Sequence, residues 1–365
     1  MTPITLKFVV NLGDQFSMDS PGPLFYRWIP GENNAITLSL SPQTSLKLWI
    51  GQSKRSRPGH EEHPTPATAD TKVWGKVEGG PLKGTLHFGS IPNNVLQAIT
   101  EKKIGDQAYI QFGKSVVKDI LESQLSRLIK ILRINFGQYW LREFFPWDSR
   151  TYTLRGYCQN VLALEWSTNG TDWEDFIPDE PQLTFHVGTI GGGRQYLSLV
   201  AEKDWVILQS LMLSEYTPSE ASSLLARAHE LFARGRHRHA FIEAVTALEV
   251  AISELTVKNL GAPLPKDVAD FSSQLVKRQL AAVSATSGLL SASDLEVALK
   301  AITLRNEIVH DGKTYGVEKQ NELLGLLQVV TKILGNTVFK FPYLDGGNLQ
   351  MPVSEWEKFE SGLNS

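Results

Sequence analysis

Residues 217–259, TPSEASSLLARAHELFARGRHRHAFIEAVTALEVAISELTVKN, decide the fold of the C-terminal part of this chain. Their apolar residues recur every three or four positions, which is the period of a helix that packs one face against a core. The segment opens with a threonine cap at Thr217, a proline at the first helical position and a glutamate, Glu220, three residues after the cap. We therefore predict one helix over about 218–233 and a second over about 237–259.

The same helical pattern continues towards the C-terminus. Further helices are expected over about 266–282, 293–311 and 316–334. Ser293 and Glu296 have the spacing of a second capping box. Five amphipathic helices with short links predict an antiparallel bundle over 217–335, and 336–365 is expected to be an irregular tail.

Residues 1–214 carry strand signals, because short β-branched or alternating runs lie between Gly, Pro and Asn clusters. Strands are expected over 4–10, 35–40, 45–50, 72–77, 83–88, 152–157, 161–166, 182–187 and 195–200. One amphipathic helix is expected near 115–134, and WSTNGTDW at 166–173 predicts a hairpin turn. The predicted fold class is α+β, with a β-rich N-terminal region followed by the helical bundle. The N-terminal region is compatible with one module or two.

Composition bounds the function without naming it. The chain has 365 residues, 42% of them hydrophobic, a net charge of −3 and a single cysteine, Cys158. No apolar run reaches the ~20 residues of a membrane-spanning helix, and the first residues lack the pattern of a signal peptide. We expect a cytoplasmic protein with no membrane partner. The charge argues against a protein that coats nucleic acid, but it leaves open an enzyme that binds a few phosphates.

The segment Arg305-Asn306-Glu307-Ile308-Val309-His310-Asp311-Gly312 carries the strongest chemical signal. Arginines five or six positions before a histidine recur at Arg55/His60, Arg57/His63 and Arg234/His239. Spacing alone is therefore uninformative. The pair Arg305 and His310 differs because it ends a predicted helix that holds both residues in register.

These residue types suit metal-independent cleavage of RNA. That reaction needs a base for the 2′-hydroxyl, an acid for the leaving oxygen and positive charge on the phosphorane. Histidine titrates near pH ~6.5 and serves as base or acid, whereas the planar guanidinium binds phosphate. On an ideal helix Asn306 and His310 are one turn apart, while Arg305 and His310 differ by about 140°. His310 lies where the helix should end, so its side chain need not follow this geometry.

This segment resembles the signature of the HEPN superfamily (higher eukaryotes and prokaryotes nucleotide-binding domains). Residues 244–249, AVTALE, resemble the end of the family's second helix, and 233–236, ARGR, resemble the turn before it. The resemblance covers about 218–334 and implies a dimer in which two copies of Arg305 and His310 form one composite site. It implies a toxin or anti-phage RNA endonuclease that leaves 2′,3′-cyclic phosphate and 5′-hydroxyl ends. We expect Arg305 to bind phosphate, His310 to act as base or acid, and Asn306 to position the RNA.

The first half resembles, through 35–38 (AITL) and 74–80 (WGKVEGG), the β-rich N-terminal module of the abortive-infection subgroup of these proteins. This resemblance implies a region that senses a trigger or chooses the substrate. The expected partners are RNA, a second copy of the chain, and an antitoxin or phage-derived trigger. No cofactor and no metal are expected.

Other residues keep two interpretations. The cluster Arg234, Arg236, Arg238 and His239 either binds RNA phosphates or forms a soluble turn. Glu249 either forms an ion pair with Arg305 or is solvated.

Two other classes of function remain for the whole chain. A non-catalytic HEPN module would bind a nucleotide or a partner protein, with Arg305 and His310 at a plain solvated helix end. Carbohydrate binding by 166–173 is the third class. The segments 60–63 (HEEH) and 188–194 (GTIGGGR) lack the spacing of a zinc protease and of a phosphate loop. The first predicts a polar loop and the second a tight β turn.

Overall fold

The computed structural model describes a large part of the chain in two compact units. The described residues are 2–11, 22–26, 28–52, 66–68, 71–73, 76–139, 141, 162–177, 200–233, 235–260, 277–281, 288–316, 319–334 and 350–352. We call the units the sheet unit (Met1–Leu132, Trp140–Tyr216 and Lys340–Ser365) and the helical unit (Arg133–Tyr139 and Thr217–Phe339). The fold class is α+β, with the main sheet in the N-terminal part and helices in the C-terminal part.

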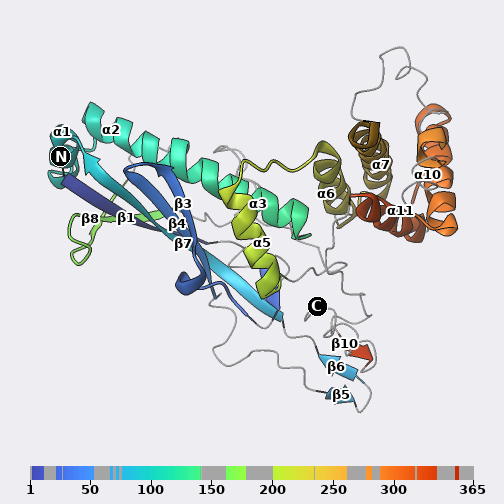
Figure 1. Cartoon of the computed structure of the whole chain (residues 1–365), viewed down its shortest axis with the longest axis horizontal. Helices are drawn as coiled ribbons and strands as arrows, with labels where there is room; N and C mark the ends of the chain where they lie inside the picture. Colours follow the sequence, from blue (N-terminus) through green and yellow to red (C-terminus); the bar gives the residue numbers. More distant parts are fainter. Residues whose placement is uncertain are drawn as a thin grey trace. The chain divides into compact units, whose positions relative to one another are not determined.

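An antiparallel sheet of seven strands forms the sheet unit (Figure 1). The strands are β1 (Thr2–Asn11), β2 (Leu24–Tyr26), β3 (Ile36–Ser41), β4 (Thr44–Gln52), β7 (Lys76–Ile91), β8 (Ala163–Ser167) and β9 (Glu174–Asp175). Their order is β3-β4-β7-β1-β8-β9, and β2 pairs with β7. The predicted strands at 4–10, 35–40, 45–50, 83–88 and 161–166 all fall in this sheet. Those at 152–157 and 182–187, and all but the end of 195–200, lie outside the described residues.

One face of the sheet is a closely packed apolar layer. Leu86 of β7 lies in register with Leu6 of β1 on one side and Leu46 of β4 on the other, and all three are fully buried. Each such side chain contributes about 1.5–3 kcal/mol to folding. Gly84 is required beside them, because a Cβ atom there would lie 2.3 Å from both the Phe8 ring and the Lys47 carbonyl oxygen.

Helices cover this inner face. They are α1 (Asn93–Thr100), α2 (Gln107–Lys114), the π-type segment η2 (Ser115–Glu122) and α3 (Ser123–Asn135). Phe112 of α2 packs against Phe88 of β7 with ring centroids 5.5 Å apart. The expected helix at 115–134 is thus the second part of a longer one that begins at Gln107. The wider turns of η2 shift its apolar stripe, so that Leu121 is fully buried where the 3.6-residue period selects Ile120.

Helix α5 (Glu202–Leu213) was not predicted. It packs near the same face, where Trp205 is buried against the Phe25 ring and donates its indole N–H to the Asn34 carbonyl at 2.9 Å. Arg127 of α3 binds carbonyl oxygens at the end of α5. The exposed Val206 obscures the amphipathic pattern of this helix, which explains the missed assignment.

The hairpin predicted at 166–173 is confirmed, because β8 pairs with β9 across it. Asn169 Oδ1 accepts the backbone N–H groups of Thr171 and Asp172, each at 2.9 Å. Gly170 has φ +78°, the left-handed conformation that glycine adopts without strain.

A second, small sheet corrects the expectation of a wholly irregular tail. Its strands are β5 (Pro66–Thr68), β6 (Thr71–Val73) and β10 (Gln350–Pro352), in the order β10-β6-β5. The short 3₁₀ helix η1 (Glu32–Asn34) precedes β3. The expected strand at 72–77 is split between β6 and the start of β7.

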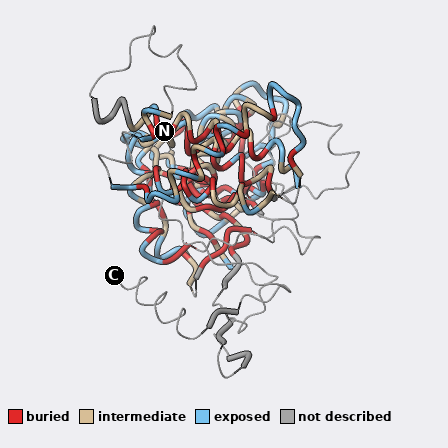
Figure 2. Tube along the Cα trace, turned by 90° about the vertical axis from the view of Figure 1, so that its right-hand side faces the viewer, coloured by how far each residue is buried: buried red, intermediate tan, exposed pale blue. Residues whose placement is uncertain are grey.

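The helical unit contains α6 (Glu220–Ala233), α7 (His237–Leu260), α10 (Ala292–His310) and α11 (Gln320–Ile333). Helix α7 packs against the other three, and Phe241, Leu248 and Ile252 on α7 are buried in the shared core. Along the chain, buried positions alternate with exposed ones (Figure 2). Of the predicted third helix, only 277–281 are described, and they are helical.

Both predicted capping boxes are displaced by two residues. At α6 the cap is Ser219, whose hydroxyl accepts the Ser222 N–H at 3.1 Å, and not Thr217. At α10 the reciprocal box joins Ser291 to Asp294, and not Ser293 to Glu296. Several Ser and Thr residues lie near each start, so the spacing alone could not choose among them. No described helix has the length and apolar character needed to cross a membrane.

Candidate active site

The last two turns of α10 carry Arg305, Asn306 and His310. Ser291 and Asp294 fix the start of this helix, and Lys332 of α11 binds the Asp294 carboxylate at 2.7 Å. The other end stops at Gly312, whose φ of +68° is left-handed, and the Lys313 N–H reaches the Glu307 carbonyl at 3.3 Å. The helix end is therefore fixed by the local sequence, as the Asp311-Gly312 pair predicted.

Arg305 is held by two partners. Its Nη2 lies 3.3 Å from Glu249 Oε2 on α7, and its Nη1 donates to Asn306 Oδ1 at 3.1 Å. The side chains of Arg305 and Glu249 are only 28% and 23% exposed, so water screens this pair less than a surface pair. Of the two interpretations of Glu249, the structure shows the ion pair.

The guanidinium is not saturated by these contacts. Within the described residues, Nε of Arg305 is buried and has no hydrogen-bond partner. Buried donors of this kind are rare in proteins and need a reason. The buried Nε–H of Arg305 is thus unused after Glu249 and Asn306 are bound.

Burial raises the pKa of Glu249 above its ordinary value, although the charge of Arg305 acts in the opposite direction. The raised pKa means that removal from water disfavours the carboxylate more than the guanidinium stabilises it. Arg305 therefore offsets part of the cost of burying the Glu249 carboxylate.

His310 differs from Arg305 because it is exposed. In the described part of the chain its side chain makes no hydrogen bond or ion pair, with Arg305 or with any other residue. This agrees with the expectation that the two side chains point in different directions from the helix. The last turn thus has one cation fixed near the core and one imidazole open to solvent.

The basic cluster before α7 lies at the same end of the unit. Gly235, with φ +69°, turns the chain between α6 and α7, and Arg238 Nη2 donates to the Ile308 carbonyl at 3.3 Å. This carbonyl is in the last turn of α10, where main-chain acceptors lack helical partners. Arg236 and His239 are exposed, and Arg234 lies outside the described residues.

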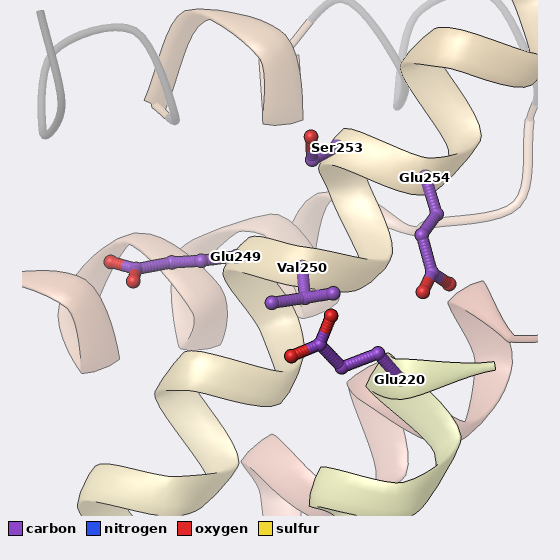
Figure 3. A pocket seen from close by; sticks show the side chains of 5 residues that line it. All are labelled: Glu220, Glu249, Val250, Ser253 and Glu254. Atoms are coloured by element: carbon purple, nitrogen blue, oxygen red, sulfur yellow. The ribbon is translucent and has the colours of Figure 1, made fainter. Parts of the chain in front are cut away.

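An acidic hollow opens beside Glu249 (Figure 3). Glu220, Glu249, Val250, Ser253 and Glu254 line its volume of about 610 Å³. The Glu249 carboxylate points away from those of Glu220 and Glu254, and Glu254 accepts the Ala221 N–H at 3.3 Å. Three carboxylates disfavour a phosphate here. The described residues contain no group of three or more His, Cys, Asp or Glu side chains placed to hold a metal.

The other sequence candidates add nothing to this site. The segments 60–63 and 188–194, and Cys158, lie outside the described residues. Sequence reasoning missed the bond from Arg238 to α10, because the two residues it joins are 70 positions apart and no local pattern marks them.

Comparisons with known proteins do not assign this chain to a family. No family model matches the sequence, and no curated protein or solved structure matches it significantly. The resemblance to the HEPN superfamily therefore stays a prediction.

Proposed function

We propose that this chain is a metal-independent RNA endonuclease of the toxin or anti-phage type, active as a homodimer through the ends of two α10 helices. The observation that carries the proposal is the contrast within one helix end: Arg305 is fixed by Glu249 and Asn306, while His310 is exposed and unengaged. A phosphate needs a positioned cation, and a proton donor or acceptor needs access to the RNA.

In the proposed reaction one His310 accepts the proton of the RNA 2′-hydroxyl. The 2′-oxygen attacks the adjacent phosphorus, and the bond to the 5′-oxygen breaks. The second His310 of the dimer protonates that 5′-oxygen. The products are a 2′,3′-cyclic phosphate and a 5′-hydroxyl, and no water or metal enters the step.

Arg305 binds the phosphoryl oxygens in this scheme. Its leftover Nε donor is available to the phosphorane once the side chain turns from its buried position. Glu249 keeps the guanidinium beside the helix end in the absence of RNA. Arg238 holds the last turn through the Ile308 carbonyl, so that the position of His310 is fixed from α7.

The test is cleavage of total cellular RNA in EDTA by the wild type and by His310→Ala, Arg305→Ala and Lys300→Ala. Lys300 is an exposed residue of the same helix and serves as the matched control. We expect discrete fragments from the wild type and Lys300→Ala only. Fragments from His310→Ala at the wild-type rate would contradict the proposal.

The second candidate function is a non-catalytic module that binds a nucleotide or a partner protein. The Glu249–Arg305 pair favours it, because a half-buried interhelical ion pair also serves a purely structural role. Intact RNA in every lane, from a folded and dimeric wild type, would favour this candidate.

A further inference from the structure

The second face of the main sheet is not covered by the helices that cover the first. Side chains alternate between the two faces of a strand, and the inner set packs under α2, η2, α3 and α5. The opposite set is exposed or half-exposed along β1, β3 and β4 and over residues 81–89 of β7. This face joins residues more than 70 positions apart in the sequence, such as Lys7 and Thr85, and no linear motif reveals it.

Three lysines gather at the centre of this face. Thr85 of β7 is in register with Lys7 of β1 on one side and Lys47 of β4 on the other. Lys83 is two residues from Thr85 and points to the same face. With strands about 4.8 Å apart, the three Cα atoms lie within about 10 Å of one another.

Lys47 and Lys83 have no acidic neighbour on the adjoining strands, whereas Lys7 lies in register with Glu165 of β8. Among the described positions of this face on β1, β3, β4 and β7, the neighbours of the lysines are Pro, Thr, Ser, Val, Trp, His and Gly. Carboxylates occur only at the β8–β9 side, at Glu165, Glu174 and Asp175. Like charges this close repel one another, and a polyanion relieves that repulsion.

Aromatic rings flank the lysines. Trp49 is half-exposed and in register with Lys83, and Lys7 Nζ lies 3.5 Å from the centre of the Trp173 ring. His87 is exposed and its Nδ1 is 3.1 Å from Thr5 Oγ1. A flat surface that joins cations to aromatic rings suits a chain of phosphates whose bases stack.

We propose that this basic face (Lys7, Lys47, Lys83, Trp49, His87 and Trp173) binds single-stranded RNA. The lysines pair with phosphates, and Trp49 stacks on a base. The inference rests on the proposed function for its choice of RNA as the polyanion. It gives the sheet unit a role in holding the substrate that the helical unit cuts.

Binding is measured with the full chain and a fluorescein-labelled 12-nucleotide RNA that carries 2′-O-methyl groups throughout. These groups block the attacking hydroxyl, so binding is read by anisotropy without cleavage. We expect Lys47→Glu/Lys83→Glu to weaken binding at least tenfold and Trp49→Leu about fivefold to tenfold. The matched control Lys114→Glu/Lys203→Glu changes the net charge equally, from exposed helical positions, and should change binding by less than about twofold.

Salt gives an independent readout. For single-stranded RNA, a plot of log affinity against log salt has a slope of about −0.7 for each phosphate that pairs with a lysine. Three lysines therefore predict a slope of about −2. The double reversal should reduce this slope to about −0.7 or less. If the reversals lower the melting temperature, Lys47→Gln/Lys83→Gln carries the same test.

Three results would overturn the inference: no binding by the wild type, equal binding by the basic-face variants, or equal weakening by the control. Competition by poly-glutamate as strong as by RNA, with Trp49→Leu harmless, would assign the face to an acidic protein instead. A wild type that binds through this face but cuts no RNA would remove the nuclease proposal and leave this one standing. If the wild type cuts RNA and Lys47→Glu/Lys83→Glu binds RNA normally, the nuclease proposal stands and the basic-face proposal falls.

Discussion

The helical unit and the sheet unit present their polar groups in different ways. In the helical unit, Arg305, Asn306 and His310 come from one helix end and are readable as a linear motif. In the sheet unit, Lys7, Lys47 and Lys83 come from three strands and meet only through the register of the sheet. The comparison teaches that a motif search finds chemistry built along a helix and overlooks chemistry built across a sheet.

The largest effect is expected from Arg305→Ala in the helical unit. Loss of the cation should reduce cleavage about 10³-fold and leave Glu249 half-buried and unpaired, which costs about 2 kcal/mol of unfolding free energy. Denaturant unfolding and RNA cleavage of the single and the double variant Arg305→Ala/Glu249→Ala separate the two effects. Stability should return in the double variant, and cleavage should not.

The matched control for that cycle is Lys300→Ala/Glu322→Ala. This pair joins α10 to α11, whereas Arg305–Glu249 joins α10 to α7, and its side chains are 67% and 37% exposed. Removal should cost no more than about 0.5 kcal/mol. A coupling energy equal to that of Arg305–Glu249 would contradict the importance given to burial.

The sheet unit should be most sensitive at Gly84. An added Cβ would collide with the Lys47 carbonyl and the Phe8 ring, so Gly84→Ala should lower the unfolding free energy by about 3 kcal/mol. Gly89→Ala, on the same strand with its nearest contact at 3.4 Å, is the control and should cost under about 1 kcal/mol. Equal melting temperatures for the two variants would contradict the close packing of the Phe8 ring and the Lys47 carbonyl against Gly84.

Arg238→Ala should have a smaller effect. It removes one hydrogen bond to the Ile308 carbonyl, worth about 1 kcal/mol, and loosens the turn that carries His310. We expect kcat to fall about tenfold with little change in KM. Arg236→Ala, in the same cluster, should raise KM only. A similar fall in kcat for Arg236→Ala would contradict a separate role for Arg238 in holding the last turn of α10.

The smallest expected effects are on stability as a function of pH. They are opposite in sign for Asp294, at the start of α10, and Glu249, which pairs with Arg305 of α10. Burial acts to raise the pKa of Asp294, but hydrogen bonds from Lys332 and Ser291 prevail and lower it. Its stabilisation is present above its unfolded pKa and is lost as pH falls through the folded value. The raised pKa of Glu249 gives the reverse, with stabilisation present at low pH and lost as pH rises through its folded value.

Urea unfolding between pH 7 and pH 3 measures this contrast. Asp294→Asn should be less stable than the wild type at pH 7 by about 0.5–1 kcal/mol, and the difference should vanish in acid. Glu249→Gln should match or slightly exceed wild-type stability at pH 7 and lose that advantage in acid. Parallel pH profiles for the two variants would exclude opposite pKa shifts.

Much of the local structure was predictable because it depends on near neighbours in the sequence. The period of the apolar residues placed α7 and α10, Gly312 marked the end of α10, and Asn169-Gly170 marked the β8–β9 turn. The missed helix α5 shows the limit of this signal, since Val206 is exposed and obscures its period.

The remainder depends on contacts between distant residues. Arg305 meets Glu249 across 56 positions, and Arg238 meets Ile308 across 70. The strand order β3-β4-β7-β1-β8-β9 likewise follows from three-dimensional packing. Periodicity names the residues that are buried, but it does not say which residues pair.

The most direct test of the nuclease is the chemistry of its RNA ends. Purified wild type and His310→Ala are incubated in EDTA with a labelled RNA, and the fragment ends are identified by mass spectrometry. Fragments with 2′,3′-cyclic phosphate and 5′-hydroxyl ends, from the wild type alone, are the predicted result. Fragments with 3′-hydroxyl and 5′-phosphate ends, or equal cleavage by His310→Ala, would contradict it.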